Sequence, residues 1–569
     1  MKTFKININS SELKILKDIV SERLKERGIN ENEKPQITLN VILDNNAEKD
    51  TFKITGSSTN INVTADSLIN CFAGVGSFLH NSRYNENGIE PSLKRELTKP
   101  DCEIRCVYLA NHFHNFFHNA PIEKIKTYIE DMALMGFNTL NMAAPSINLK
   151  KSDKANIEKE NQRLYSFFNI GKSLGMKLMT FVQTSQTYED FPKELEFTKH
   201  DANNNSGNVM CISKKGALDI IISENKEYLE GIKNNGLTVD YLMTWPYDEG
   251  GCNCENCRPW GRNGYVRAAK SVTEKAKEIF PYAKIVCSTW TFDYNTEFAN
   301  SPEKSEWVGF AESLNDDKWA DIILADAHEE FPKYPLEKGV PGNLPIISFP
   351  EISMWGLYPW GGYGANPLPK RITKVWRETE GILKGESLYS EGIYEDLNKY
   401  IISGLCEDFN RNPDEMLANY SSYYLGCVEN EKFTELINLI EYNHWLTSEL
   451  VDIDHVPQDI IVARENIKAK IGNNKSDIFC DLEASEKAYK IACDINKVLP
   501  EWGKNSWRWR IIFIRALLDF HRYSGVNINE NEITLSAMHE LIDIFHCLKR
   551  NSINDIFHER VRPICPEYD

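Results

Sequence analysis

Residues 104–142 decide the fold of this chain and have the sequence IRCVYLANHFHNFFHNAPIEKIKTYIEDMALMGFNTLNM. The apolar run at 104–110 predicts a buried strand, 122–135 has apolar residues at helical spacing, and 139–143 predicts a second strand. A strand, an amphipathic helix and another strand predict a parallel β-α-β unit, because the helix buries one face on the sheet that the strands form.

The same alternation of strand and helix patterns continues to about residue 400. The expected strands are 104–110, 139–143, 177–183, 239–245, 284–290, 321–325, 344–349 and 387–390. The expected helices between them include 122–135, 160–174, 216–234, 266–280 and 372–383. Eight such units are typical of a (β/α)8 barrel, whose site lies at the carboxyl ends of the strands.

Two regions without this alternation flank the barrel. Before it, a short helix, several strands and a second helix predict a small α/β domain. After it, only helices with apolar stripes are evident. We therefore predict three domains: an N-terminal α/β domain at 1–98, the barrel at 99–405 and a C-terminal helical domain at 406–569.

The composition excludes several classes of partner. The 569 residues carry a net charge of -18, which argues against nucleic acid and anionic membranes and suits a neutral polar ligand such as a carbohydrate. The first residues lack the apolar core of a signal peptide, and no segment is apolar enough to span a bilayer. With 14 cysteines scattered or clustered, not arranged as a disulfide framework, we expect a cytoplasmic location. Homo-oligomer formation stays open.

The chemistry is concentrated in residues 242–265, LMTWPYDEGGCNCENCRPWGRNGY. Asp248 and Glu249 follow the expected fourth strand, and the two glycines after them let the chain turn so that both acids can line one pocket. A solvated acidic turn is the alternative interpretation. The aromatic residues around the acids favour a functional site: Trp245, Tyr247 and Trp260.

Acids, amides and indoles also follow the other expected strands. Carboxylates beside aromatic rings are what glycoside hydrolysis uses, because one acid protonates the leaving oxygen and indole faces pack on the sugar ring. Each acid alone could be a helix N-cap, and histidines at such positions are more often structural. The candidates are Asn111, His112, His114, Gln183, Thr184, Gln186, Trp290, Asp293, Asp326, His328, Glu329, Glu351, Trp355, Trp360, Glu391, Tyr394, Glu395 and Asp396.

Residues 104–142 resemble the opening of the barrel in glycoside hydrolase family 20: an Arg on the first strand, an aromatic-rich turn, and a helix leading to a Phe-Asn-x-Leu strand. The region before them resembles the non-catalytic domain that precedes the barrel in that family and in the α-glucuronidases. The acid pair at 248–249 is similar to the pair of the substrate-assisted N-acetylhexosaminidases. The resemblance extends over roughly residues 35–400.

This resemblance implies a role for each matching residue. Asp248 would orient the acetamido group of the substrate, which acts as the nucleophile, and Glu249 would be the general acid/base. Arg105 and Glu391 would hold ring hydroxyls. His112 and Glu351 are further candidate contacts, and the resemblance makes three indoles candidates for the pocket wall: Trp290, Trp355 and Trp360.

Several alternatives stay open, because the His-x-Gly-Gly that precedes the family's acid pair is replaced here by Thr-Trp-Pro-Tyr at 244–247. One is a retaining enzyme with Glu249 as acid/base and Glu351 as nucleophile. Another is an α-glucuronidase-like inverting enzyme that pairs Glu249 with a distant carboxylate such as Glu391. Carboxylate separations of about 5–5.5 Å for retention and about 6.5–9.5 Å for inversion distinguish them. A non-catalytic carbohydrate-binding protein is the competing class.

A cysteine cluster follows the acid pair directly. Cys252, Cys254 and Cys257 can supply three thiolates to one tetrahedral ion, and Cys211 in the preceding loop is the candidate fourth ligand. Chance clustering in a cysteine-rich chain is the alternative. If these residues bind zinc, the metal is structural and clamps the loop after Glu249, because four thiolates leave no open position for water. No organic cofactor is expected.

Overall fold

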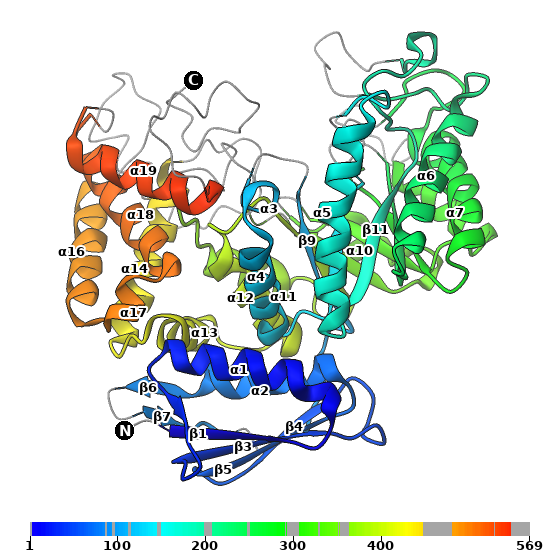
Figure 1. Cartoon of the computed structure of the whole chain (residues 1–569). Coiled ribbons are helices and arrows are strands. Elements are labelled where there is room, and N and C mark those ends of the chain that lie inside the picture. Colours follow the sequence, from blue (N-terminus) through cyan, green and yellow to red (C-terminus); the bar gives the residue numbers. More distant parts are fainter. Residues whose placement is uncertain are drawn as a thin grey trace.

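The computed structural model consists of an N-terminal α/β domain, a closed barrel and a C-terminal helical domain (Figure 1). This is the three-part α/β barrel architecture that the sequence predicts. The model describes residues 3–447, 462 and 481–547, apart from 86–87, 94–96, 112–114, 145–148, 199–207, 247–250, 291, 293–305, 328–329, 351, 353–363 and 528–529.

The N-terminal domain is a six-stranded sheet in the order β2-β1-β3-β5-β4-β8, with α1 (Lys14–Glu26) and α2 (Leu68–Asn81) between the sheet and the rest of the molecule (Figure 1). Gly76 of α2 faces α4, where an added Cβ would lie 1.7 Å from the Leu134 carbonyl oxygen. The glycine therefore permits close contact with the barrel. The strands are β1 (Thr3–Ile8), β2 (Asn30–Glu31), β3 (Ile37–Leu43), β4 (Phe52–Gly56), β5 (Asn60–Ala65) and β8 (Leu97–Thr98), and a hairpin adds β6 (Arg83–Asn85) and β7 (Gly88–Glu90).

Eight parallel strands close the barrel, and β16 pairs with β9 to complete it. The prediction of a (β/α)8 barrel is confirmed. The strands are β9 (Ile104–Leu109), β10 (Thr139–Met142), β11 (Lys177–Gln183), β12 (Tyr241–Trp245), β13 (Lys284–Ser288), β14 (Ile322–Ala327), β15 (Ile346–Pro350) and β16 (Leu383–Ser390).

The last strand begins four residues earlier than expected, at Leu383. Lys384, Gly385 and Glu386 interrupt the apolar pattern that marks a strand in the sequence. Gly385 is required there, because it has φ 154° and an added Cβ would lie 2.1 Å from the Ile104 carbonyl oxygen. The barrel closes where β16 approaches β9, and this close approach requires a glycine. The glycine interrupts the apolar pattern by which the strand could be recognised in the sequence.

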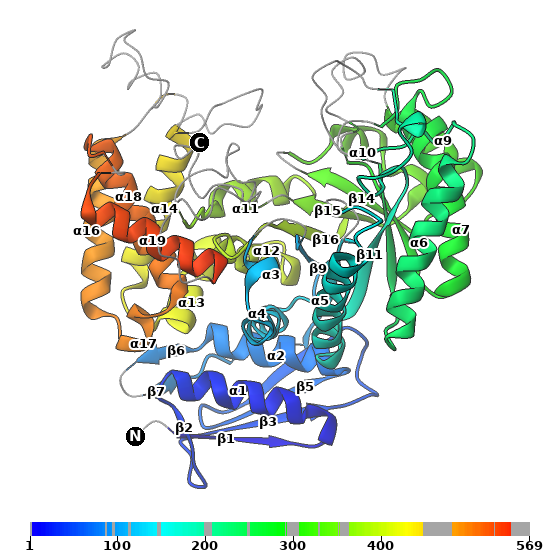
Figure 2. The same ribbon diagram turned by 45° about the horizontal axis from the view of Figure 1, so that its top comes forward.

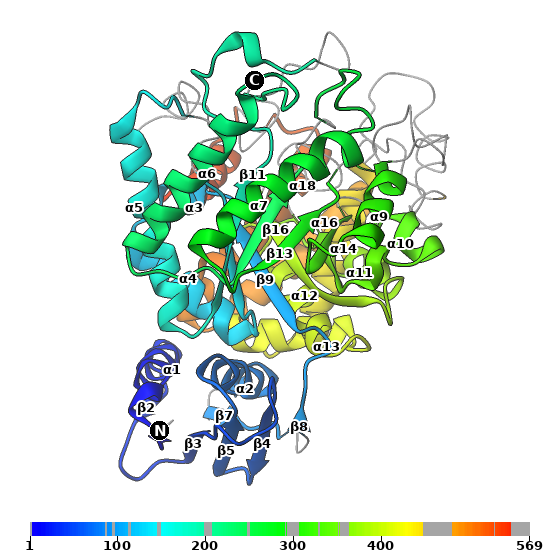
Figure 3. The ribbon, with the colours of Figure 1, turned by 90° about the vertical axis from the view of Figure 1, so that its right-hand side faces the viewer.

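Helices cover the outside of the barrel, and α5, α6 and α7 lie along its outer surface (Figure 3). The helices are α3 (Phe116–Asn119), α4 (Ile122–Met135), α5 (Lys154–Ser173), α6 (Ala217–Asn234), α7 (Arg267–Ile279), α9 (Glu306–Asp316), α10 (Lys333–Lys338), α11 (Pro369–Arg377) and α12 (Asp396–Glu407). Short 3-10 or π segments are Ser11–Leu13, Lys193–Leu195, Gly261–Val266, Pro341–Asn343 and Ser421–Leu425.

The C-terminal helical domain packs against the side of the barrel that carries α3, α4 and α12 (Figure 2). Its described helices are α13 (Pro413–Tyr420), α14 (Asn430–Thr447), α16 (Leu482–Val498), α17 (Glu501–Lys504), α18 (Trp507–Tyr523) and α19 (Glu532–His546). The sequence pattern also predicts a helix at 458–471, of which only residue 462 is among the described residues. Within the described part of the chain, every helix is too short or too polar to traverse a bilayer.

A buried ionic network joins the three domains. Asp131 of α4 accepts a hydrogen bond of 2.9 Å from Arg23 of α1 and another of 2.9 Å from Arg508 of α18. Arg23 also donates to Glu130, and Arg508 donates to Asp396. Burial by itself would raise the pKa of Asp131, but the charges and hydrogen bonds of Arg23 and Arg508 hold this pKa below its usual value.

Replacing Asp131 by Asn should lower the free energy of unfolding by about 3–5 kcal/mol, because two buried guanidinium groups lose their shared carboxylate. Urea unfolding measures this. The Asp131 contribution is complete above the ordinary Asp pKa of about 3.9 and is lost as the pH falls through the lower folded-state pKa, so the wild type should lose more stability on acidification than the variant.

The matched control is Glu33→Gln, which removes one partner of the exposed Lys5–Glu33 pair. It should leave the urea midpoint nearly unchanged, because solvent screens exposed ion pairs. Equal effects of the two substitutions would contradict the role assigned to the buried network.

Candidate active site

Aromatic side chains fill the barrel interior near the carboxyl ends of the strands. Neighbouring ring centroids are 4.8–6.2 Å apart. We call this layer the aromatic platform, and its members are Tyr108, Phe181, Trp245, Trp290, Phe349 and Tyr389. Trp245 is the most exposed of the six, and it stacks on Trp290 with ring centroids 5.2 Å apart and an interplanar angle of 28°. The platform is therefore an apolar layer at the carboxyl ends of the strands, and its most exposed member is the Trp245 indole.

The alternation of side chains along each strand builds this layer. In β12, Tyr241 and Met243 belong to the interior cluster, whereas Leu242 packs with the outer core and Thr244 bonds to Tyr265 outside the barrel. Trp245 therefore occupies the last interior position of the strand. Asp248 and Glu249 come three and four residues later and lie outside the described residues.

Trp260 holds both residues that flank 247–250. Its indole Nε1 donates to the Pro246 carbonyl oxygen at 2.7 Å. On the other side, an added Cβ at Gly251 would lie 2.1 Å from the same ring, so the ring packs directly on the glycine backbone. Trp260, which the sequence places among the aromatic residues around the acids, is fully buried. It holds Pro246 and Gly251, the residues on either side of 247–250.

At the end of β16, Glu391 accepts a hydrogen bond of 2.7 Å from the Tyr389 hydroxyl. Glu391, which follows β16, and Asp326, the fifth residue of β14, are both buried near the carboxyl ends of their strands. Asp396 is also a candidate site residue in the sequence. Its carboxylate instead accepts hydrogen bonds from Tyr420 and Arg508, where the barrel meets the helical domain. Tyr394 likewise turns toward the helical domain, where its hydroxyl donates to the Leu541 carbonyl oxygen.

Arg105 does not lie at the rim. It is the second residue of β9, near the amino end, and its guanidinium donates to the carbonyl oxygens of Gly136 and Cys102. Val107 and Leu109, which lie two and four residues later on the same face of β9, pack in the outer core. Cys106 and Tyr108, on the other face, point to the interior. Because strand side chains alternate, Arg105 points out of the barrel, and we remove it from the candidate substrate contacts.

Several predicted site residues lie outside the described residues, and the predictions for them stay predictions. They are Asp248, Glu249, His112, Glu351, Trp355 and Trp360, together with His114, Asp293, His328 and Glu329. Of the described rim residues, Gln183 is buried with its backbone N–H bonded to Asn225, and the Thr184 hydroxyl donates to the Trp245 carbonyl oxygen. The first contact joins the end of β11 to α6, and the second joins it to the end of β12.

Four members of the platform are not among the residues predicted from the sequence: Tyr108, Phe181, Phe349 and Tyr389. Charged residues in the loops after the strands stand out in a sequence, whereas aromatic residues inside the strands do not. A sequence feature that identifies these residues is an aromatic side chain one or two positions before the end of a strand. It lies on the same face of the strand as the other interior residues.

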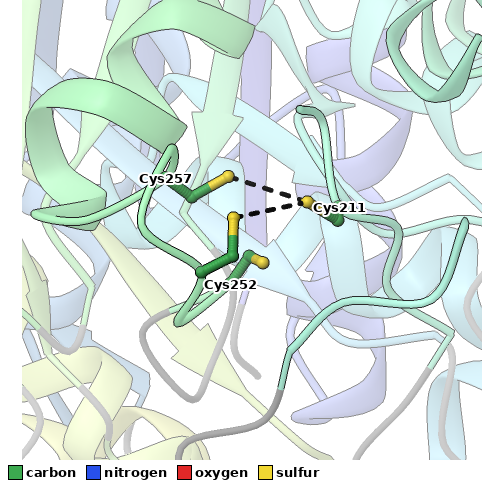
Figure 4. A group of neighbouring side chains, drawn as sticks. Cys211, Cys252 and Cys257 are labelled. Carbon is green, nitrogen blue, oxygen red and sulfur yellow. Dashed lines mark hydrogen bonds between the residues drawn. The ribbon is translucent and has the colours of Figure 1, made fainter. Parts of the chain in front are cut away.

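The four predicted cysteine ligands come together. The Sγ atoms of Cys211, Cys252, Cys254 and Cys257 all lie within 4.8 Å of one another, from two loops that face each other (Figure 4). Cys211 Sγ is 3.7 Å from Cys254 Sγ and 3.8 Å from Cys257 Sγ. A tetrahedral ion with sulfur at about 2.3 Å separates its ligands by about 3.8 Å, so the cluster has the size of a four-thiolate metal site.

The surroundings of this cysteine cluster connect the loops after β11 and β12. The Thr198 N–H donates to Cys252 Sγ at 3.3 Å, and the Asn253 N–H donates to the Thr198 carbonyl oxygen at 2.8 Å. Hydrogen bonds within the cluster lower the pKa of the Cys252 thiol and raise the pKa of the Cys257 and Cys211 thiols, so the neighbouring thiols stabilise one thiolate of the cluster. The cluster therefore holds the chain immediately after the acidic turn.

No protein-family model and no curated protein matches this sequence. Solved structures match its fold. A family 89 glycoside hydrolase from Clostridium perfringens, in complex with 2-acetamido-1,2-dideoxynojirimycin, has a TM-score of 0.60 at 15% identity, covering 94% of this chain and 66% of its own. A family 138 glycoside hydrolase that targets pectin rhamnogalacturonan II has a TM-score of 0.57 at 10% identity, covering 95% and 70%.

A family 20 exo-β-N-acetylglucosaminidase from Vibrio harveyi, in complex with N-acetylglucosamine, has a TM-score of 0.51 at 11% identity, covering 74% of this chain and 73% of its own. The chain spans about two thirds of the length of the family 89 structure. The class is therefore defined by fold: a (β/α)8 barrel of the kind found in hexosaminidase-type glycoside hydrolases. The expected distant structural likeness to family 20 is confirmed.

Replacing Trp260 by Phe should lower the free energy of unfolding by about 1–3 kcal/mol, because the Pro246 carbonyl oxygen loses its donor. If Asp248 and Glu249 act as the sequence predicts, the substitution should also weaken ligand binding or turnover about tenfold or more, because Trp260 holds Pro246 and Gly251 on either side of them. Urea unfolding and steady-state kinetics measure the two effects.

The control is Trp509→Phe in α18, where a fully buried indole donates to Asn496 at 2.9 Å. It should lower stability comparably and leave the kinetics unchanged. A loss of activity that follows stability equally in both variants would contradict the specific role of Trp260.

Proposed function

We propose that this chain is an exo-acting glycoside hydrolase, with Glu249 as the general acid and Asp248 beside it. The observation that carries the proposal is the aromatic platform at the carboxyl end of a barrel shared with glycoside hydrolases. The partly exposed Trp245 stands three residues before Asp248, where its indole can pack on the apolar face of a pyranose. In such barrels the chemistry takes place at this end.

In the proposed reaction the acetamido oxygen of the substrate attacks the anomeric carbon while the Asp248 carboxylate holds the acetamido N–H. Glu249 protonates the leaving oxygen, and as a carboxylate it then takes a proton from the water that opens the cyclic intermediate, so the configuration is retained. N-acetyl specificity is supported by the ligands of the similar family 89 and family 20 structures, which both carry a 2-acetamido group.

A second candidate uses Glu249 as acid/base and Glu351 as a covalent nucleophile. One observation favours it: the family 89 structure covers 94% of this chain, and a variant of that enzyme with two glutamates changed to glutamine binds its substrate GlcNAc-α-1,4-galactose. Because that bond is α-linked and family 20 includes a β-specific enzyme, the anomer distinguishes the candidates.

The α-glucuronidase-like inverting enzyme is the third candidate. Binding a uronic acid requires a cation for the substrate carboxylate. The loops that follow β14, β15 and β16, at 328–332, 351–368 and 391–395, contain no Lys or Arg, whereas the loops after β10, β11 and β12 do, among them Lys150, Lys199 and Arg258. This candidate would place the substrate carboxylate toward these loops.

We also propose that the cysteine cluster binds one zinc ion, because its sulfur separations fit tetrahedral coordination. Zinc held by four thiolates stabilises structure and offers no site for water. Cys252, Cys254 and Cys257 then fix the loop that follows the acidic turn, and Cys211 ties it to the loop after β11.

The mechanism is tested on α- and β-nitrophenyl glycosides, with and without a 2-acetamido group, using Glu249→Gln, Asp248→Asn and Glu351→Gln. Glu249→Gln should reduce turnover by about 10²–10⁴-fold on poor leaving groups and less on activated ones. In the first mechanism Asp248→Asn cripples 2-acetamido substrates, and a thiazoline analogue of the cyclic intermediate binds tightly. In the second, a 2-fluoro sugar labels Glu351.

The outcomes separate the candidates. A covalent adduct on Glu351, or rapid turnover of substrates without an acetamido group, would replace the first mechanism by the second. Small, equal losses for Glu249→Gln on good and poor leaving groups would exclude Glu249 as the acid. Sugar binding without turnover of any glycoside would make the chain a carbohydrate-binding protein.

Zinc should be present at about one ion per chain by elemental analysis, and its removal by a chelator should lower the thermal midpoint. Cys257→Ser should lose the metal, whereas Cys427→Ser, a buried cysteine outside the cluster, should keep it. Protein purified without metal that melts at the same temperature as zinc-supplemented protein would contradict the proposal.

A further inference from the structure

Lys399 of α12 lies completely buried beneath the turn that follows β16. Its ammonium donates to the Gly392 carbonyl oxygen and to the Tyr128 hydroxyl, both at 2.8 Å. It also lies 3.4 Å from a carboxylate oxygen of Glu395, whose side chain is likewise fully buried. A buried charge is unfavourable unless its donors and acceptors are satisfied, so the contacts of this pair require an explanation.

The carboxylate of Glu395 holds the turn from the other side. Its Oε1 accepts from the Ser390 hydroxyl at 2.7 Å and from the Gly392 N–H at 3.0 Å. Both neighbours of Glu391 are therefore fixed by one carboxylate, and the Gly392 carbonyl is fixed by Lys399. We call this pair of residues, Glu395 and Lys399, the turn anchor.

The opposite side of the turn is closed by the helical domain. An added Cβ at Gly392 would lie 2.3 Å from the Phe545 ring of α19. The turn is thus held between the anchor and α19, and the side chain of Glu391 is aimed by the Tyr389 hydroxyl of the aromatic platform. The neighbouring Asp396 serves the domain junction instead, through Arg508.

We propose that Glu395 and Lys399 are positioning residues that fix Glu391 where its carboxylate accepts a hydroxyl of the bound sugar. This inference rests on the proposed function. Apart from the Tyr128 hydroxyl, the polar contacts of the anchor go to residues 390–392, so the buried charges act on the segment that carries Glu391. An apolar pair would fill the same space but could not bind the Gly392 N–H and the Gly392 carbonyl oxygen, which belong to the two peptide groups on either side of its Cα.

A mutant cycle tests this inference. The anchor variant Lys399→Met/Glu395→Gln removes both charges together and leaves neither buried without its partner. It is combined with Glu391→Gln, and kcat, KM and the thermal midpoint are measured on the best nitrophenyl glycoside. The matched control is Arg411→Met/Glu407→Gln, which removes an ion pair that includes the last residue of the same helix, at its other end.

The anchor variant should lower kcat/KM by about 10–100-fold in the wild-type background and by less than about threefold when Glu391 is already Gln, because it acts through that residue. The control should change kcat/KM by less than about twofold. The same loss in both backgrounds, or a lower thermal midpoint with unchanged kcat/KM, would reduce the anchor to a stabilising ion pair and overturn the inference.

Two further outcomes are distinguishable. If the anchor variant does not fold, the isosteric Glu395→Gln alone completes the cycle. If the wild type hydrolyses no glycoside, the proposed function fails, and the cycle is measured as the Kd of N-acetylglucosamine by tryptophan fluorescence. Coupling between the anchor and Glu391 in Kd would then support positioning for binding. Uncoupled or undetectable binding would overturn it.

Discussion

The arrangement of the three domains depends on the Asp131 carboxylate. It accepts from Arg23 of the N-terminal domain and from Arg508 of the helical domain, and all three side chains are at most 8% exposed. Removing a charge of this kind from water is costly, and only the partner charges offset the cost. Each flanking domain therefore supplies one of the positive charges that compensate the buried carboxylate of the barrel. Contact with both domains thus stabilises the barrel.

The same network extends to the rim of the barrel. Arg508 also binds Asp396, the first residue of α12. Glu395, which precedes this helix, and Lys399 in its first turn lie beneath the turn of Glu391. On the other side of the rim, Trp260 and the cysteine cluster hold the residues that flank 247–250, after β12. The turn of Glu391 and these flanking residues are thus held by elements outside the candidate site, which is how loop residues acquire the accuracy that catalysis or selective binding requires.

The likeness to glycoside hydrolases at 10–15% identity has a physical basis. A parallel barrel requires alternating interior and exterior side chains, helices with one apolar face, and space where strands approach closely, as at Gly385. Many sequences satisfy these conditions. Substrate choice is decided instead by the loops after the strands, which vary without disturbing the barrel.

The sequence by itself determined the local features: the eight strands, most of the helices, the order of the domains and the cysteine spacing. Periodicity and ligand spacing are properties of neighbouring residues, so they can be recognised without coordinates. Only the tertiary structure decided which residues meet. It directed Arg105 out of the barrel, buried Trp260, assigned Asp396 to the domain junction and paired Asp131 with Arg508, 377 residues apart in the chain. Such contacts arise when the barrel closes and the domains pack on it, and no local pattern encodes that geometry.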